Sequence, residues 1–202
     1  MNIIERVKNI LIKPKDEWEV ISRENTPVAQ LVTSYLLLLA LIPAAAQFIR
    51  YGLIGYNIPF AGHVSGSWSW GIRQAVVSYI ATVGGAFISA MIIDMLAPNF
   101  ASRKNFNKAM ELVVYSYTAS FVAGIFYLVP GLGFLAMLGG LYGLYLLYMG
   151  MKPMMETPED KLAPYFIVSL LVIIGVTIVL SLILGAILLS RAALTGVGMP
   201  GM

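Results

Sequence analysis

The sequence has no cysteine among its 202 residues and only one histidine. Without thiols the chain forms no disulfide, offers no thiolate nucleophile and holds no cysteine-ligated metal, and the single histidine has no second nitrogen or thiolate ligand beside it. Charged residues are also scarce, at 11% of the chain compared with roughly 25% in an ordinary soluble domain. We therefore expect neither a metal nor a cofactor.

Sequence signals of enzymatic chemistry are absent as well. There is no nucleophile elbow, phosphate-binding loop, HExxH motif or pair of catalytic carboxylates in a plausible cleft. The net charge is only +3, and the aromatic residues lie in apolar runs instead of a basic patch. We therefore expect a protein that is not an enzyme and that does not bind nucleic acid.

Long apolar runs dominate the chain, and hydrophobic residues make up 59% of it. A helix of about 20 apolar residues crosses the roughly 30 Å hydrocarbon core of a bilayer. The run from Glu111 to Met151 would measure about 60 Å as one helix, so it must fold back, and Pro130 with its neighbouring glycines marks the turn. The predicted transmembrane helices are Val28 to Leu53, Ile72 to Leu96, Ala109 to Val129, Leu132 to Met151 and Ala163 to Leu189.

These runs predict an all-α, polytopic membrane protein with five transmembrane helices and a short N-terminal amphipathic helix. We divide it into a cytoplasmic amphipathic arm (residues 1–27), a transmembrane domain (28–190) and a flexible outer tail (191–202). The arm carries an apolar stripe of Ile3, Ile4, Val7, Ile10 and Leu11. That stripe either lies among the lipid headgroups of the bilayer or packs against the protein's own helix ends.

Basic residues indicate the orientation of the five helices. The arm holds five, the loop after the second helix three and the loop before the fifth helix two, whereas the opposite side has only Arg50, Arg73 and Arg191. Basic residues concentrate on the cytoplasmic side of membrane proteins. We therefore predict a cell (inner) membrane protein with its N-terminus in the cytoplasm and its C-terminus outside.

Two carboxylates lie within the predicted helices, where charge is costly and marks a candidate site. Asp94 and Glu111 are near the inner ends of the second and third helices, and a short basic loop joins these helices. They could meet each other and form a proton or cation relay, or they could form structural ion pairs with Arg103, Lys104 or Lys108. We favour the structural ion pairs.

The fourth helix is rich in tyrosine and glycine. Tyr142, Tyr145 and Tyr148 recur at every third residue, and Tyr115 lies on the preceding helix. The hydroxyls could line a small pathway, although helix packing is the interpretation we favour. Gly139 and Gly143 form a GxxxG motif, which allows either a homo-oligomer or an intramolecular helix crossing.

Three segments together resemble the Yip family, the Ypt/Rab-interacting membrane proteins, and in particular its short prokaryotic branch. They are a P-x-x-x-W-x-x-I-x-x-E pattern at Pro14, Trp18, Ile21 and Glu24, the segment FNKAMELVVYSYT with Phe106, Ala109 and Tyr115, and the segment from Gly150 to the TPEDK of residues 157–161. The resemblance covers most of residues 1–190. It implies a compact five-helix domain with a cytoplasmic N-terminus and no enzymatic activity.

Eukaryotic relatives of this family bind prenylated Rab GTPases through long cytoplasmic N-terminal regions. This chain departs from them because only 27 residues precede Val28, so Rab binding is not carried over. The leading hypothesis is a scaffold or adaptor whose cytoplasmic face engages lipid headgroups or a protein partner. Its candidate residues are Pro14, Trp18, Arg103, Lys104, Lys108, Thr157, Pro158, Glu159, Asp160 and Lys161.

The competing hypothesis is a small transporter or channel for protons or cations. Its candidate pathway consists of Asp94, Glu111, Tyr115, Tyr142 and Tyr145. A third, weaker alternative is a lipid-handling protein with lipid bound between its helices. The TPEDK segment serves either as a docking epitope or only as the start of the last helix.

Overall fold

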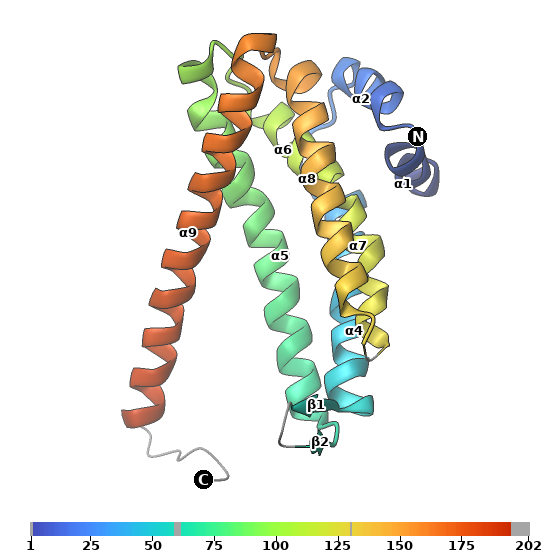
Figure 1. The fold of residues 1–202 in the computed structure, drawn as a ribbon, viewed down its shortest axis with the longest axis vertical. Coiled ribbons are helices and arrows are strands. Elements are labelled where there is room, and N and C mark those ends of the chain that lie inside the picture. The colour runs from blue at the N-terminus through green and yellow to red at the C-terminus, as the bar shows by residue number, and fades with distance from the viewer. Residues whose placement is uncertain (1, 59–61, 130, 195–202) are drawn as a thin grey trace.

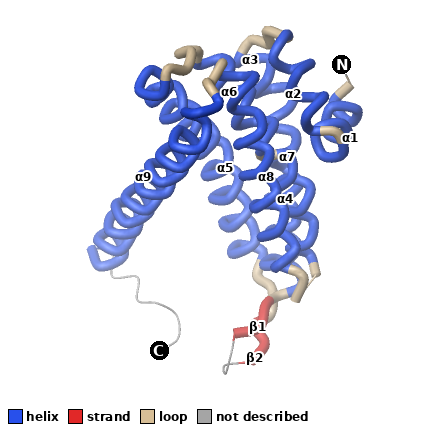
Figure 2. Tube along the Cα trace, turned by 45° about the horizontal axis from the view of Figure 1, so that its top comes forward, coloured by secondary structure: helices blue, strands red, loops and turns tan. Residues whose placement is uncertain are grey.

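The computed structural model describes residues 2–58, 62–129 and 131–194, and for residues 57, 58, 181 and 183–194 only the backbone. Within these residues, five helical segments are long and apolar enough to cross a membrane, which confirms the predicted all-α architecture. They are Val28–Ile54, Trp68–Phe100, Phe106–Leu128, Gly133–Met155 and Glu159–Leu180. Figures 1 and 2 show them as a bundle with two short helices against its side.

The spans are built from shorter elements. The first contains α3 (Val28–Leu31), the π-helical turn η1 (Val32–Leu36), α4 (Leu37–Ile49) and the π-helical turn η2 (Arg50–Ile54). The second contains α5 (Trp68–Leu96) and the 3₁₀ turn η3 (Ala97–Phe100), and the third contains α6 (Phe106–Ser116), α7 (Thr118–Ala123) and the 3₁₀ turn η4 (Gly124–Leu128). The fourth is α8 (Gly133–Met155), and the fifth belongs to α9 (Glu159–Leu194).

The two ends of the bundle differ (Figure 1). One end, named the arm end here, carries the N-terminal helices α1 (Ile3–Ile12) and α2 (Pro14–Arg23), the turn η3 and the α8–α9 connection. The other, the hairpin end, carries the strands β1 (Tyr56–Ile58) and β2 (Gly62–Val64), which pair antiparallel. This hairpin was not predicted from the sequence. Because the chain crosses the bundle five times, the start of the chain and the far end of α9 lie at opposite ends.

The third span is the centre of the bundle. Within its apolar stretch 72% of the residues are buried, compared with 11% in the fifth span. It is not one continuous helix as predicted, because α6 stops at Ser116, whose hydroxyl donates to the carbonyl of Leu112 at 2.7 Å. Such bonds from Ser to the preceding turn bend helices. By contrast, α9 contacts α5 and α8 near the arm end and then leans away from them (Figures 1 and 2).

The N-terminal arm forms two helices where the sequence predicted one. Helix α1 (Ile3–Ile12) ends before Lys13, and α2 (Pro14–Arg23) begins with a proline. The residue before a proline is disfavoured in helical conformation, while proline itself suits the first helical position. Pro14 therefore separates two short helices, and both pack against the bundle (Figure 1).

The turn between the third and fourth spans lies where the sequence placed it. Gly131 has φ of +90°, a left-handed conformation that favours glycine, while Pro130 lies outside the described residues. At the C-terminus α9 continues to Leu194, so the first residues of the predicted tail are helical. Residues 195–202 of that tail lie outside the described residues.

The GxxxG motif of α8 faces helices of the same chain. A β-carbon placed on Gly139 would lie 2.2 Å from Cβ of Ala123, and one on Gly143 would lie 3.0 Å from the carbonyl oxygen of Ser116. Small residues let helices approach this closely in membranes. The two glycines therefore support an intramolecular crossing of α8 with α6 and α7.

Candidate functional site

Trp18 anchors the arm to the bundle. Its side chain is only 1% exposed, and its ring packs edge-on to Tyr115 with centroids 6.4 Å apart. The indole also lies directly over Gly150 of α8, where a β-carbon would come within 2.6 Å of Trp18 Cε2. Trp18, predicted as a cytoplasmic interaction residue, is thus a core residue that holds α2 on α6 and α8.

Arg6 joins α1 to α2 through two carboxylates, those of the buried Glu17 and the partly exposed Glu24. Its Nη1 donates to Oε1 of Glu17 at 2.6 Å, and Nη2 donates to Glu24. The side chains of Arg6 and Glu17 are each 6% exposed. Burial alone would lower the pKa of Arg6, but the hydrogen bond to Glu24 and the surrounding charges raise it overall. The guanidinium therefore stays charged, and it also lies over the ring of Tyr115 at 5.3 Å.

Glu111 and Lys108 form a second buried ion pair at the junction between arm and bundle. Lys108 Nζ lies 2.9 Å from Oε2 of Glu111, whose side chain is 1% exposed. The other oxygen of Glu111 accepts from the backbone N–H of Thr26 at 2.9 Å, and Lys108 also donates to the carbonyls of Ile21 and Glu24. For Glu111 the structure thus has a structural ion pair, the interpretation favoured from the sequence. The pair also holds the end of α2 through the hydrogen bonds of Lys108 to its carbonyls.

Asp94 lies in a different environment from Glu111. It is 9% exposed, and its Oδ1 has no hydrogen-bond partner among the described residues. The nearby Tyr165 hydroxyl donates to the carbonyl of Ile93 at 2.6 Å. Neither Arg103 nor Lys104 pairs with Asp94 among the described residues, since Arg103 pairs with Glu156.

The tyrosines of the predicted pathway divide between two places. Tyr115 packs edge-on to Tyr35 with centroids 4.9 Å apart, at the junction of arm and bundle. Tyr142 donates to the carbonyl of Leu11 at 2.8 Å, and its ring lies 5.7 Å from that of Tyr145. Because the last carbonyls of a helix lack partners within that helix, Tyr142 ties the end of α1 to α8.

The predicted basic loop and the TPEDK segment meet at the arm end. The Thr157 hydroxyl accepts from Ser102 at 2.9 Å and donates to the carbonyl of Met151 at 3.2 Å. The backbone N–H of Arg103 donates to the carbonyl of Met155 at 2.8 Å, and its side chain pairs with Glu156 at 2.7 Å. Thr157 is buried, so the exposed part of the segment consists of Glu159, Asp160 and Lys161, with Pro158 half-buried.

The basic residues of the arm end fall into two groups. Arg6 and Lys108 are turned inward and held in the buried ion pairs. The remainder are exposed and surround the arm end: Lys8, Lys13, Lys15, Arg23, Arg103, Lys104, Lys152 and Lys161.

A cavity of about 630 Å³ lies between α2, α8 and the start of α9. We call it the α2–α8 cavity. Its walls come mainly from aromatic and aliphatic side chains: Trp18, Tyr145, Tyr148, Met149, Pro153 and Leu162. Four charged residues complete the lining: Lys15, Glu19, Lys152 and Glu156. Sequence reasoning did not find this cavity, because its walls belong to helices far apart in the chain.

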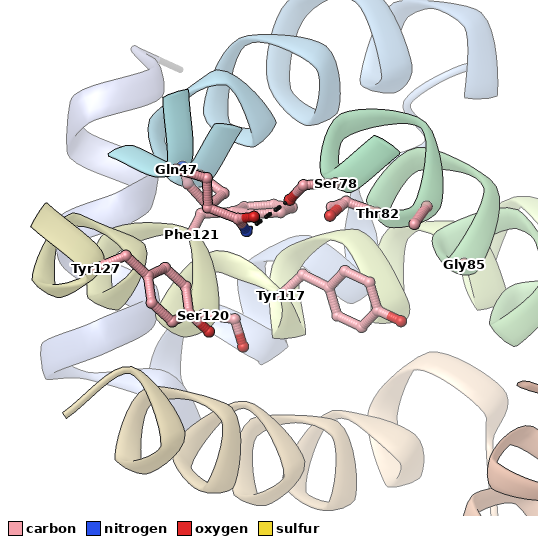
Figure 3. A pocket seen from close by; sticks show the side chains of 10 residues that line it. Gln47, Ser78, Thr82, Gly85, Tyr117, Ser120, Phe121 and Tyr127 are labelled. Carbon is pink, nitrogen blue, oxygen red and sulfur yellow. Dashed lines mark hydrogen bonds between the residues drawn. The ribbon is translucent and has the colours of Figure 1, made fainter. Parts of the chain in front are cut away.

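A second cavity, of about 380 Å³, lies among α4, α5 and α7 (Figure 3). Its polar lining is uncharged: Gln47, Ser78, Thr82, Tyr117, Ser120 and Tyr127. Gln47 donates to Ser78 at 2.9 Å, as the dashed line shows. A neighbouring cavity of about 250 Å³ shares Gln47 and Tyr127 and reaches Arg50 at the hairpin end. The sequence analysis did not predict this cavity, because its polar side chains come from separate membrane spans.

Comparisons with known proteins bear on the family of this chain. A family model described as the Yip1 domain matches residues 8–193. The chain belongs to the Yip1 family. Two relatives named "Inner membrane protein YohC", from Escherichia coli K12 and Escherichia coli O6:H1, are each 29% identical over 151 residues, covering 73% of this chain and 77% of theirs. No solved structure matches the chain.

The Yip1 match confirms the resemblance drawn from Pro14, Trp18 and residues 157–161. The structure adds a role for the first of these segments. Pro14 starts α2, Trp18 fills the space over Gly150, and Glu24 pairs with Arg6. In this Yip1-family membrane protein the P-x-x-x-W-x-x-I-x-x-E pattern thus docks the arm on the bundle.

Proposed function

We propose that this protein is a non-enzymatic scaffold of the inner membrane whose arm end faces the cytoplasm and engages lipid headgroups. One observation carries the proposal: the arm is held against the bundle by buried contacts, while most basic residues of this end remain exposed. A protein partner at the same face is the alternative that the experiment below separates.

The physical argument begins with the division of charge at the arm end. Arg6 and Lys108 neutralise buried carboxylates, so they contribute nothing to an outer surface. Among the exposed basic residues, Arg103, Lys152 and Lys161 pair with carboxylates of the same end. Each of the others is worth about 1 kcal/mol of attraction to an anionic leaflet. Because the arm is fixed and not tethered loosely, these charges act from set positions. This supports a platform that concentrates anionic lipid around the protein.

The test measures which lipids surround the protein after reconstitution into bilayers of known composition. Electron paramagnetic resonance of spin-labelled phosphatidylglycerol and phosphatidylcholine gives their relative association with the protein. We expect preference for the anionic lipid, reduced by Lys8→Gln, Lys13→Gln and Arg23→Gln together, and reduced by salt because screening shortens the interaction. The matched control changes Arg50 and Arg73 at the hairpin end to glutamine and should preserve the preference.

An unchanged lipid preference in the arm variant would contradict the lipid proposal. If that variant instead lost a specific protein that co-purifies with the wild type, the cytoplasmic face would be a protein-docking site. The arm should stay docked on the bundle in this variant, because none of the three substituted residues takes part in the ion pairs of Arg6 and Lys108.

A second candidate function, transport of protons or cations, is favoured by two observations: Asp94 Oδ1 has no hydrogen-bond partner among the described residues, and a polar cavity lies among α4, α5 and α7 (Figure 3). Buried ionisable groups within membrane helices are candidate sites for ion movement. Flux in proteoliposomes that disappears in Asp94→Asn, with unchanged thermal unfolding, would support it. Absence of proton and cation flux in the folded wild-type protein would contradict it.

A further inference from the structure

The α2–α8 cavity combines an apolar wall with charges of both signs. Tyr145, Tyr148 and Met149 follow one face of α8, and Leu162 closes the side toward α9. Tyr145 and Tyr148 are 47% and 38% exposed, so this wall leaves large apolar surfaces uncovered. Exposing apolar surface to water costs about 25 cal/mol per Å², and an acyl chain in the cavity would cover this surface.

The charges at the cavity repeat in matching pairs. Lys15 and Glu19 are four residues apart on α2, and Lys152 and Glu156 are four residues apart along α8 and its end. At this spacing Lys15 and Glu19 lie on the same face of α2. Glu156 instead caps the end of α8 in a left-handed conformation, with φ of +51°. Each helix presents one ammonium group and one carboxylate to the cavity, and the four charges sum to zero.

Two of these charges also have partners outside the cavity. Lys152 pairs with Glu159, with side chains 52% and 81% exposed, and Glu156 pairs with Arg103, with side chains 60% and 65% exposed. Exposed ion pairs contribute little to stability. Both groups can therefore exchange their partner for a ligand of complementary charge.

We propose that the α2–α8 cavity binds one zwitterionic aminophospholipid, such as phosphatidylethanolamine. Its phosphate lies between Lys15 and Lys152, its ammonium group contacts Glu19 and Glu156, and one acyl chain covers the wall formed by Tyr148 and Met149. The inference rests on the proposed function, because it requires the arm end to lie in the headgroup layer.

Charge complementarity distinguishes this lipid from an anionic one. Phosphatidylglycerol has the same phosphate and would satisfy the two lysines, but its headgroup brings no cation to the carboxylates of Glu19 and Glu156. The ethanolamine ammonium brings one positive charge to these two carboxylates and donates hydrogen bonds to them, and hydrogen bonds to ionised groups are the stronger kind. Phosphatidylcholine offers the same charges, but its trimethylated nitrogen has no N–H to donate.

The experiment is native mass spectrometry of the full chain with phosphatidylethanolamine, phosphatidylglycerol or phosphatidylcholine of equal acyl length. We expect one phosphatidylethanolamine to remain bound at collision energies that remove other lipids. Glu19→Gln together with Glu156→Gln should weaken its binding about tenfold, toward that of phosphatidylglycerol. The same double variant should leave phosphatidylglycerol binding unchanged or slightly stronger.

A second variant tests the acyl-chain wall by a different route. Met149→Trp should fill the cavity and abolish binding of a single lipid. The control is Met137→Trp on the same helix: Met137 is 65% exposed and does not line the cavity, so this variant should still bind the lipid. Thermal unfolding of each variant shows that it is folded. The glutamine variants change only exposed positions at the rim, so they remain informative even if Met149→Trp fails to fold.

Several results would overturn the proposal. Equal retention of all three lipids, or equal retention in Met149→Trp and Met137→Trp, would mean ordinary annular lipid. A dimer that Met149→Trp abolishes would mean that a second copy occupies the cavity. These outcomes are separable from failure of the scaffold proposal, whose test substitutes Lys8, Lys13 and Arg23, none of which lines the cavity.

Discussion

Gly150→Ala should loosen the arm from the bundle, because the glycine is where Trp18 meets α8. The added β-carbon would lie 2.6 Å from Trp18 Cε2, 2.8 Å from Trp18 Cζ2 and 2.6 Å from Leu112 Cδ1. The leucine methyl can rotate away, but the indole is rigid and 1% exposed. Overpacking of this kind costs typically 1–3 kcal/mol, so we expect the free energy of unfolding to fall by about 2 kcal/mol.

A double-mutant cycle with Trp18→Ala isolates this contact. Trp18→Ala alone should cost about 3–5 kcal/mol, since it leaves a large cavity in a packed site. In that background the added β-carbon meets only the Leu112 methyl group, which can rotate away. The better helix propensity of alanine should then make Gly150→Ala neutral or stabilising by up to about 1 kcal/mol. Unfolding in mixed micelles, followed by circular dichroism, gives all four free energies and their coupling.

Gly140→Ala provides the matched control on the same helix. A β-carbon there meets nothing within 4 Å, so this variant should be as stable as the wild type or slightly more so. If Gly150→Ala proved as harmless as Gly140→Ala, or cost the same with and without Trp18, the docking of α2 on α8 would be refuted.

Three further predictions use other parts of the molecule. Lys108→Met should lower the free energy of unfolding by about 3–5 kcal/mol because it leaves the buried Glu111 charge unpaired, and adding Glu111→Gln should restore part of the loss; equal instability of both variants would argue against the ion pair. Gly139→Ala should destabilise the fold by about 1–3 kcal/mol without changing oligomeric mass, since its methyl group would overlap α7; a loss of dimer instead would place the GxxxG motif at an interface between copies. The native chain has no cysteine, so a single introduced cysteine reports on its own side of the membrane. In right-side-out membrane vesicles an impermeant maleimide should label Ser65→Cys at the hairpin end and should not label Asn99→Cys at the arm end. The reverse labelling pattern would mean that the orientation is opposite to the predicted one.

The parts of the fold that the sequence predicted depend on local properties. Membrane spans require apolar runs of a set length, and the turn between the third and fourth spans needs residues such as Gly131 with φ of +90°. Within the site, the ion pair of Lys108 and Glu111 was foreseeable because residues three apart share a helix face. The break at Pro14 followed the same local chemistry but was not used in the prediction.

The residues that the arm contacts could not be predicted from such local properties. Arg6 meets Glu17 and Glu24 only because α1 folds back on α2, and Trp18 meets Gly150 across most of the chain length. The pattern containing Trp18 and Glu24 indicated the family but not what these side chains contact. Asp94 shows the same limit: its membrane position was evident, whereas its unpaired Oδ1 depends on which neighbours surround α5.

The sequence by itself therefore determined that the protein lies in a lipid bilayer and how many helices cross it, because hydrocarbon thickness and the need to satisfy backbone groups act on each segment separately. Its local motifs also indicated the family. Only the tertiary structure decided that the arm is docked, which basic residues remain exposed, and where the cavities lie. The physical reason is that burial, charge pairing and cavity walls depend on helices distant in sequence, and a side chain's role is set by what packs against it.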